Sequence, residues 1–393
     1  MDNKNLKTLL RIGFNAAISP IICLLYIASP LLRVQFIRIR DDRIGGLASS
    51  TELFLRRLDL GIIKEKGTFY IGVASTRPCN SQLLKMFKRK MCIINVPQML
   101  AGLFFSPVSL AMKSGFFSFL PIKANEYFEF SYGSPSIDFT PNEENKGREL
   151  LKKMGLKEND WFICLLARDS KYLSKRFADI NFDYHDYRNW DIATALQAAE
   201  YIASKGGFVI RMGAAVEKEL KTNNPRIVDY ASNFRSDFGD VYLAAKCKFF
   251  LGDGCGLHQV AQIFNVPEAW VNVLPLQSPP WSMRGTYIPK KIWSLEYKRF
   301  LSFAEIIDKG VSHAVRTEDY HNSHVKWADN SSEEILDLVK EVNERMNGKF
   351  RPTKEDNGLQ VKFRLLFKPG MHCRGFLSRI GARFLKENEF LLK

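Results

Sequence analysis

A glycine-rich turn at residues 251–256, with the sequence Leu-Gly-Asp-Gly-Cys-Gly, is the stretch of this chain best suited to binding an anion. It follows a short apolar run and precedes an expected helix at 257–264. Glycines let the backbone approach a ligand closely, and the free N–H groups at a helix start attract an anion such as a diphosphate. Turns of this kind also form for purely geometric reasons, so the turn needs support from other residues.

Arginines at the ends of two other apolar runs supply that support. Arg211 lies at the end of the run 208–212, just before Gly213, and Arg168 follows the run 161–167. An arginine at a strand end can hold a phosphate with two parallel hydrogen bonds. Pairing of Arg168 with Asp169 or Asp237 is the structural alternative. Three strand ends that carry arginine or glycine together favour an anion site.

A polar loop at residues 183–189, Asp-Tyr-His-Asp-Tyr-Arg-Asn, places His185 beside carboxylates. Such a histidine can act as a general base, although a loop histidine is more often solvated. The chain contains no GxxxxGK[ST], GxGxxG, HExxH or GxSxG motif, which argues against P-loop kinases, dinucleotide oxidoreductases, zincins and α/β-hydrolases. Asp41 and Asp42 are adjacent rather than spaced for a metal. We therefore expect neither a metal nor another cofactor.

The elements that must position these residues follow from the alternation of short, partly β-branched apolar runs with segments of helical period. This alternation is typical of buried parallel strands and their crossover helices, whose polar ends meet at one edge of the sheet. We expect strands at 34–40, 68–74, 91–96, 161–167, 208–212, 227–229, 248–251 and 269–273, and helices at 52–60, 80–89, 143–154, 191–204, 214–221, 236–246, 257–264 and 332–346, with irregular chain after Pro275.

At 393 residues the chain suits two domains with extra segments. A Pro-containing stretch at 132–145 is the expected interdomain linker. The predicted division is a hydrophobic membrane-associating segment at 1–33, an N-terminal α/β domain at 34–145, a C-terminal α/β domain at 146–350, and a basic amphipathic tail at 351–393.

Net charge is +15, and ten of these excess positive charges lie in residues 1–43 and 351–393. Such terminal charge suits an anionic membrane surface better than a nucleic-acid groove. Residues 12–32 are uncharged and long enough to cross a bilayer, so they suggest a signal anchor, an interfacial segment or a buried helix. The apolar tail at 375–392 fits either a membrane-surface helix or a helix that packs back on the N-terminal domain. We expect membrane association.

Two further features leave their interpretation open. Residues 101–120 are apolar and aromatic, which fits a domain core, a lipid-facing patch or the wall of a cleft for an apolar acceptor. The seven cysteines have no CxxC or Cys/His spacing, and several lie in apolar runs. They are therefore expected to be small buried side chains in a reducing cytosol.

Residues 186–267 resemble a family of GT-B-type glycosyltransferases encoded in bacterial surface-polysaccharide (O-antigen and capsule) gene clusters. The motifs that carry the resemblance are Asp-Tyr-Arg-Asn at 186–189, Val-Ile-Arg-Met-Gly at 209–213, Ile-Val-Asp-Tyr-Ala at 227–231, Arg-Ser-Asp at 235–237, the 252–256 turn and Phe-Asn-Val-Pro at 264–267. Arg168-Asp169 and the segment Arg-Ile-Gly-Gly-Leu at 43–47 extend it to roughly residues 34–345.

The resemblance implies an α/β fold of GT-B type, with two Rossmann-like domains facing a central cleft. It also implies a nucleotide-diphosphate donor in the C-terminal domain and an acceptor in the N-terminal domain. By position, the resemblance implies donor binding by Arg168, Arg211, Gly213, Gly252, Gly254, Cys255 and Gly256. The matching segments add Arg188, Asn189, Asp229, Tyr230 and Arg235 as candidate donor-binding residues, and our candidate catalytic residues are Asp42, Arg168 and His185.

One position departs from the family pattern, which has histidine where this chain has Gly46. If that histidine is the catalytic base, the role has moved here, to Asp42 or His185, or activity has been lost. The expected function is transfer of a sugar from a nucleotide-diphosphate sugar to a lipid-linked or glycan acceptor, at the cytoplasmic face of the inner membrane. The alternatives are a GT-B-fold epimerase or hydrolase acting on nucleotide sugars, and a non-catalytic membrane-surface scaffold.

Overall fold

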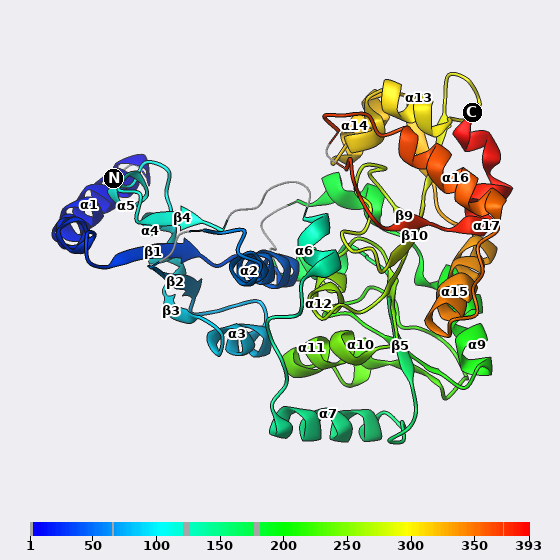
Figure 1. Ribbon diagram of the computed structural model, residues 1–393, viewed down its shortest axis with the longest axis horizontal. Helices are drawn as coiled ribbons and strands as arrows, with labels where there is room; N and C mark the ends of the chain where they lie inside the picture. The colour runs from blue at the N-terminus through cyan, green and yellow to red at the C-terminus, as the bar shows by residue number, and fades with distance from the viewer. Residues whose placement is uncertain (1–2, 65–66, 121–125, 177–180, 372) are drawn as a thin grey trace. The chain divides into compact units, whose positions relative to one another are not determined.

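The computed structural model describes residues 3–64, 67–120, 126–176, 181–371 and 373–393 (Figure 1). The chain forms two compact units. Unit 1 comprises Met1–Lys123 and Gly133–Phe139, and unit 2 comprises Ala124–Tyr132 and Thr140–Lys393. The change from one unit to the other overlaps the expected linker at 132–145. Each unit is an α/β structure built on a parallel sheet.

Unit 1 contains a four-stranded sheet in the order β3-β2-β1-β4, and every neighbouring pair is parallel. Its strands are β1 Arg33–Arg38, β2 Thr68–Ser75, β3 Cys92–Val96 and β4 Phe117–Phe119. The first three agree with the predicted strands to within two residues. Helix α3, Ser81–Lys88, begins after Asn80, whose side chain accepts a hydrogen bond from the Leu83 N–H. This N-cap explains where the helix starts.

Helix α2, Ile44–Asp59, begins eight residues before the predicted start at residue 52, so residues 44–51 belong to the helix as well. No side chain caps its first turn. The helix is held from its middle, where the buried Glu52 pairs with Arg56 at 2.8 Å and accepts a hydrogen bond from the Ser136 N–H. Tertiary contacts of this kind outweigh capping signals, which is why the sequence misplaced the start.

The N-terminal helix α1, Asn3–Ala28, packs one side against α4, Gln98–Phe104, and α5, Leu110–Lys113. The 101–120 segment is therefore divided: Phe105 and Phe117 are buried in the core of unit 1, whereas Phe119 is half exposed. By length and composition, Thr8–Ala28 is the one candidate membrane span within the described residues, with a mean hydropathy of 1.7.

Unit 2 is organised around a seven-stranded parallel sheet in the order β14-β10-β9-β8-β5-β6-β7. The chain fills one half of this sheet from β5 outward to β7 and then returns to build the other half from β8, which is the doubly wound Rossmann arrangement. The strands are β5 Phe162–Leu166, β6 Phe208–Arg211, β7 Ile227–Asp229, β8 Phe250–Gly252, β9 Glu268–Val273, β10 Gly285–Pro289 and β14 Arg379–Ile380.

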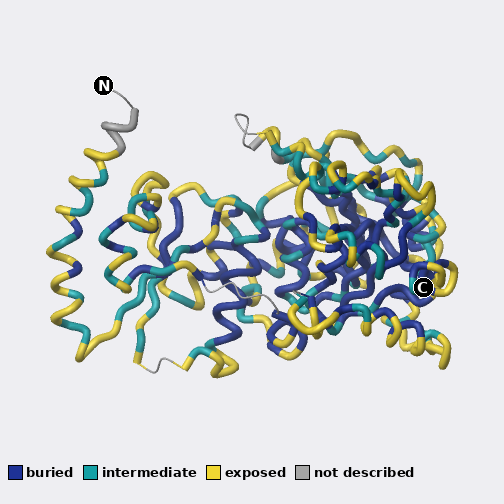
Figure 2. The backbone as a smooth tube through the Cα atoms, turned by 90° about the horizontal axis from the view of Figure 1, so that it is seen from above, coloured by how far each residue is buried: buried dark blue, intermediate teal, exposed yellow. Residues whose placement is uncertain are grey.

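Helices cover both faces of this sheet (Figure 1). Helices α9, Leu196–Ser204, and α15, Ser332–Met346, pack together on one face, and α11, Asp237–Lys246, and α12, His258–Ile263, on the other. The strands between them are almost entirely buried, as the dark backbone in Figure 2 shows. The other helices are α6 Tyr127–Tyr132, α7 Pro141–Lys153, α8 Lys171–Arg176, α10 Tyr230–Asn233, α13 Phe303–Asp308, α14 Thr317–Asn322, α16 Lys354–Leu365 and α17 Ala382–Glu387, with 3-10 turns η1 Asp183–Arg188, η2 Ile192–Ala195, η3 Val311–His313 and η4 Glu389–Leu392.

The predictions for unit 2 failed in three places. Residues 214–221 are not helical, because side chains take up their backbone groups: Asp169 accepts from the Glu217 N–H, and Arg211 donates to the Lys218 carbonyl. The chain after Pro275 is not irregular, because it forms β10 and a second, antiparallel sheet in the order β12-β11-β13. The strands of this second sheet are β11 Lys291–Ser294, β12 Arg299–Phe300 and β13 Val325–Ala328.

The third failure concerns the C-terminal segment, which was expected to form a basic amphipathic helix at 375–392. It forms the short strand β14, helix α17 and the turn η4 instead. Strand β14 extends the main sheet by pairing with β10, and Phe376, Ile380 and Phe384 are buried in the core of unit 2. The apolar side of this segment therefore packs within unit 2, which matches neither of the two expected arrangements.

Candidate functional site

The strand order of unit 2 creates an opening at the carboxyl ends of β5 and β8. The chain leaves β5 toward β6 on one side and leaves β8 toward β9 on the other. The two loops therefore diverge, and ligands of open α/β sheets bind at such a switch point. Here the loops carry Arg168 after β5 and the turn 252–256 after β8. The site is thus formed where the sequence placed its strongest motif.

Arg168 and Arg188 reach this opening from two segments. The Arg168 guanidinium donates to the His185 carbonyl at 3.1 Å and to the Asn189 side-chain oxygen. Asn189 in turn donates to Asp186 at 2.8 Å, and Arg188 donates to the Gly254 carbonyl. Burial lowers the pKa of Arg168, and the charge of the neighbouring Arg188 lowers it further. Two cations are therefore held close together at the switch point.

Asp253 is the carboxylate that faces these cations. It is only 2% exposed, and its oxygens accept no hydrogen bond from an N–H or O–H group within the described ranges. Burial raises its pKa, while the nearby charges of Arg188 and Arg168, the weakly donating Cys255 thiol and the charge of Lys290 act in the opposite direction. A buried carboxylate without a strong donor is costly, so this group is suited to accept hydrogen bonds from a ligand.

Lys290 completes the cluster, and the sequence reasoning missed it. It follows β10, is almost fully buried, and donates to the Asn189 carbonyl at 2.8 Å while pairing with Asp329 at 2.7 Å. Burial lowers its pKa. Its signal in the sequence was weak, because a lysine in a stretch predicted to be irregular is normally expected to be exposed. We refer to Arg168, Arg188, Asp253 and Lys290 as the switch-point cluster.

The glycines of the 252–256 turn have structural reasons for being there. A Cβ on Gly252 would lie 2.6 Å from the Leu166 carbonyl oxygen, and one on Gly254 would lie 3.3 Å from the Trp270 ring. Helix α12 after the turn has only six residues and no side-chain cap. Burial strongly raises the pKa of the Cys255 thiol, so it is not a ready nucleophile. The turn brings β5 and β8 together, and Asp253 and the surrounding cations supply its polar chemistry.

Arg211, predicted to bind the donor, lies in a buried ion pair. Its guanidinium is 3.1 Å from the nearer Asp229 oxygen and donates to the Lys218 carbonyl at 2.8 Å. Asp229 also accepts hydrogen bonds from Leu220 and Ser232, so both residues have structural roles. Arg211 nevertheless lines a pocket of ≈ 300 Å³ together with Arg168 and Asn189. The pocket adjoins the switch-point cluster on the β6 side.

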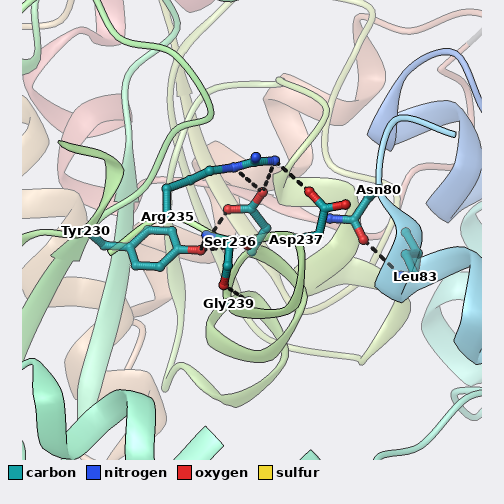
Figure 3. Close-up of polar contacts among 8 residues, drawn as sticks. Asn80, Leu83, Tyr230, Arg235, Ser236, Asp237 and Gly239 are labelled. Carbon is teal, nitrogen blue, oxygen red and sulfur yellow. Dashed lines mark hydrogen bonds and ion pairs between the residues drawn. The ribbon is translucent and has the colours of Figure 1, made fainter. Parts of the chain in front are cut away.

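Tyr230 and Arg235, also predicted for the donor site, belong to a second network at the start of α11 (Figure 3). Tyr230 donates to the Asp240 carboxylate at 3.0 Å, and Arg235 pairs with Asp240 at 2.9 Å. Burial raises the pKa of Asp240 to about 6. Ser236 caps the helix through the Gly239 N–H. The same view includes the separate N-cap of α3 in unit 1, where the Asn80 side chain accepts from the Leu83 N–H.

The remaining predicted residues have the following positions. Gly213 has a φ of 153°, which favours glycine, and a Cβ there would collide with Val216. The His185 ring packs against Tyr184, with ring centroids 4.1 Å apart, and its carbonyl holds Arg168. Asp42 belongs to unit 1, where it is exposed after β1 and lies 3.9 Å from Arg43.

Gly46 lies in the first turn of α2. A Cβ at this position would be 3.3 Å from both the Cβ and the carbonyl oxygen of Arg40. Any side chain there, the histidine of the resembling family included, would require the 40–43 loop to shift slightly. Within the described residues, no group of three His, Cys, Asp or Glu side chains is arranged to hold a metal ion.

Comparisons with known proteins give the following picture. No family model and no curated protein matches the sequence. Among solved structures, ADP-heptose LPS heptosyltransferase II of E. coli shares 14% identity over 80% of this chain and 100% of that chain, with a TM-score of 0.49. A glycosyl transferase family 9 protein of Veillonella parvula shares 10% identity over 79% of this chain and 97% of that chain, with a TM-score of 0.45.

The E. coli heptosyltransferase WaaC, solved with ADP, shares 12% identity over 66% of this chain and 91% of that chain, with a TM-score of 0.34. These structural neighbours are glycosyltransferases. Similarities at these identities and scores carry no inference about the substrate or the reaction of this chain. The switch-point cluster is the feature of this chain that bears on its function.

Proposed function

We propose that the chain is a glycosyltransferase that moves a sugar from a nucleotide-diphosphate sugar to a lipid-linked or glycan acceptor. The observation that carries the proposal is the switch-point cluster, in which a buried carboxylate without an N–H or O–H donor lies among three cations. A ligand that satisfies this cluster needs an anionic part for the cations and hydroxyl groups for the carboxylate. A nucleotide-diphosphate sugar carries both.

The cations suit the leaving group of such a transfer. Negative charge develops on the departing diphosphate as the bond to the sugar breaks, and fixed positive groups in a site with little water stabilise it. Arg188 and Lys290 are fixed by bonds to the Gly254 and Asn189 carbonyls, respectively. They can do this without reorganising, and we propose that they replace a metal ion in this role.

Asp253 suits the other half of the donor. An ionised carboxylate accepts several hydrogen bonds, so its two oxygens can receive two neighbouring hydroxyls of a sugar or ribose ring. Binding of those hydroxyls would relieve the cost of burying the carboxylate. This accounts for an aspartate whose oxygens have no N–H or O–H donor in the described part of the chain.

The acceptor hydroxyl needs a base, and we keep two candidates for it. Asp42 follows β1 at the carboxyl edge of the unit 1 sheet, and His185 lies in the turn that holds Arg168. Replacement of the true base should lower kcat by at least about 100-fold and leave donor binding intact. Replacement of the other residue should leave kcat nearly unchanged. We further propose that the acceptor belongs to surface-polysaccharide synthesis and is used at the cytoplasmic face of the membrane.

A thermal-shift screen of the purified protein against UDP-, GDP-, CMP-, ADP- and dTDP-sugars tests the proposal. One class of donor should raise the melting temperature of the wild type and of an Arg226→Gln control, but not of Arg188→Gln. Arg226 is a matched control, because it is also partly buried and donates to one carbonyl, that of Gly206, at the opposite edge of the sheet. Absence of a shift with every donor would refute the proposed donor site.

Turnover then separates this function from its alternatives. Release of the nucleoside diphosphate that depends on an added acceptor supports a transferase. Formation of an epimer without acceptor would identify an epimerase. Donor binding without any turnover, with every acceptor tested, would favour the non-catalytic scaffold.

A further inference from the structure

Helix α1 has two different sides. Ile18 and Ile22 are buried, and the rings of Phe14 and Phe104 lie 5.0 Å apart. The opposite side exposes large apolar side chains that recur at helical spacing along almost the whole helix, namely Leu10, Ile21, Leu24 and Ile27, the last two 65% and 75% exposed. Figure 2 shows this alternation along the helix at the N-terminus. One side is therefore already packed, and the other has no cover in the described structure.

Polar contacts fix α1 to unit 1 along much of its length. The Asn15 side chain accepts a hydrogen bond from the Leu110 N–H at 3.1 Å, and the Tyr26 hydroxyl donates to the Ser114 carbonyl at 2.8 Å. These anchor points are 11 residues apart, or roughly 17 Å along a helix. Crossing a bilayer would carry the irregular chain around α5 and the exposed Lys113 into hydrocarbon, which lipid-exposed backbone does not tolerate.

Charge on this part of unit 1 is of one sign. Residues 3–40 and 91–120 supply α1, β1, β3, α4, α5 and β4, and contain no aspartate or glutamate. Their charged residues are all lysine or arginine, among them the exposed Arg33 just beyond the helix and the exposed Lys113 at the end of α5. Met99 of α4 and Val108 before α5 are exposed apolar side chains as well. An apolar stripe with basic flanks and no acidic residue complements an anionic lipid surface.

We infer that α1 lies in the plane of an anionic membrane, with the stripe Leu10, Ile21, Leu24 and Ile27 inserted among the lipids, and that it docks unit 1 without spanning the bilayer. The inference specifies how the proposed membrane location is achieved and does not depend on the switch-point cluster. A protein that binds vesicles but no donor would support it, and one that binds a donor but no vesicles would overturn it.

Vesicle co-sedimentation tests the docking surface. The wild type should bind phosphatidylcholine vesicles that contain phosphatidylglycerol more tightly than phosphatidylcholine vesicles alone. The double variant Leu24→Asp/Ile27→Asp should lose binding by roughly a hundredfold, since each buried side chain contributes on the order of tenfold or more. The matched control is Val361→Asp/Leu365→Asp, a pair of exposed apolar residues on α16 of unit 2, which should bind like the wild type.

Labelling from one side distinguishes lying in the membrane plane from spanning. Thr8→Cys and Ser29→Cys mark the two ends of the helix, in a background where the native thiols that are not buried, Cys23, Cys79 and Cys92, are serine. In sealed inside-out vesicles from expressing cells, a membrane-impermeant maleimide should label both ends, while the native Cys23 of the wild type should be protected by lipid.

Protection of one end until the vesicles are broken would show a spanning helix and overturn the inference. Equal binding by the wild type and Leu24→Asp/Ile27→Asp would do the same. A dimer that this variant dissociates, together with no vesicle binding by the wild type, would show that a second copy of the chain covers the stripe, and would also overturn it.

Discussion

Glu268 is a buried carboxylate that has no cationic partner among the described residues, and it should make the stability of unit 2 depend on pH. It lies at the start of β9, is fully buried, and accepts hydrogen bonds from the Trp270 ring N–H at 3.1 Å and from Gln262 at 3.2 Å. Burial raises its pKa from 4.5 to about 8, and these two donors only partly oppose the change. The folded state therefore keeps a proton that the unfolded state releases between pH 4.5 and 8.

The contribution of Glu268 to stability decreases as pH rises. Because the folded state binds more protons than the unfolded state in this range, the contribution is fully present below pH 4.5 and decreases up to pH 8. Between pH 5.5 and 7.5 the free energy of unfolding should fall by roughly 2–3 kcal/mol, since each pH unit corresponds to at most about 1.4 kcal/mol. For a unit of this size the change corresponds to roughly 5–10 °C in melting temperature.

Glu268→Gln removes the titrating group with little change of shape. The new amide can donate to the Gln262 side-chain oxygen, which has no partner in the described residues, once the Gln262 amide turns over. The melting temperature of the variant minus that of the wild type, measured by circular dichroism, should rise by roughly 5–10 °C from pH 5.5 to 7.5. A Glu305→Gln control, whose carboxyl pKa is held at about 2 by Arg299, should show a constant difference. If the melting-temperature difference between Glu268→Gln and the wild type were also constant from pH 5.5 to 7.5, Glu268 would not be the source of the pH dependence.

Three further changes test the packing around the site. Gly252→Ala places a methyl group 2.6 Å from the Leu166 carbonyl oxygen and should destabilise unit 2 by about 2 kcal/mol or more in urea denaturation. The control Gly358→Ala, which has open space around it on α16, should not destabilise the protein. Arg211→Ala leaves the Asp229 carboxylate without its cation and should lower the free energy of unfolding by about 3 kcal/mol, part of which the double variant with Asp229→Ala should restore. If Arg211→Ala instead weakens donor binding and leaves stability unchanged, the structural role of Arg211 is wrong. His258 is buried and its pKa is lowered to about 3, so it contributes stability that is present above pH 6.5 and is lost as pH falls toward 3. His258→Gln should therefore make the melting temperature less sensitive to acid, and an unchanged pH profile of the melting temperature would contradict this prediction.

The sequence predicted the sheet of unit 2 better than its site. Strands β5, β6, β7, β8 and β9 were expected within two residues of their observed ends, because buried parallel strands appear as continuous apolar runs between turns. Helix α15 was predicted with its observed bounds, since Ser331 and Glu334 form a capping box. Such local signals do not depend on distant parts of the chain.

The switch-point cluster depends on distant contacts, which explains why only part of it was predicted. Arg168, Arg188 and Asn189 were selected because they follow apolar runs or lie in a polar loop. Lys290 was missed because its burial depends on Asn189, about 100 residues earlier in the chain, and on Asp329. Arg211 matched the same strand-end pattern as Arg168, but its partner Asp229 could not be identified before the β6–β7 register was known. Spacing alone cannot distinguish an arginine already paired from one available to a ligand.

Isothermal titration of the nucleotide sugar that stabilises the wild type tests the central claim most directly. Dissociation constants should be compared for the wild type, Arg188→Gln and the matched control Arg226→Gln. Loss of one charged hydrogen-bonding group to a diphosphate should weaken binding of Arg188→Gln by at least about tenfold, and the control should bind like the wild type. Equal affinity of all three proteins would show that the donor does not bind at the switch-point cluster.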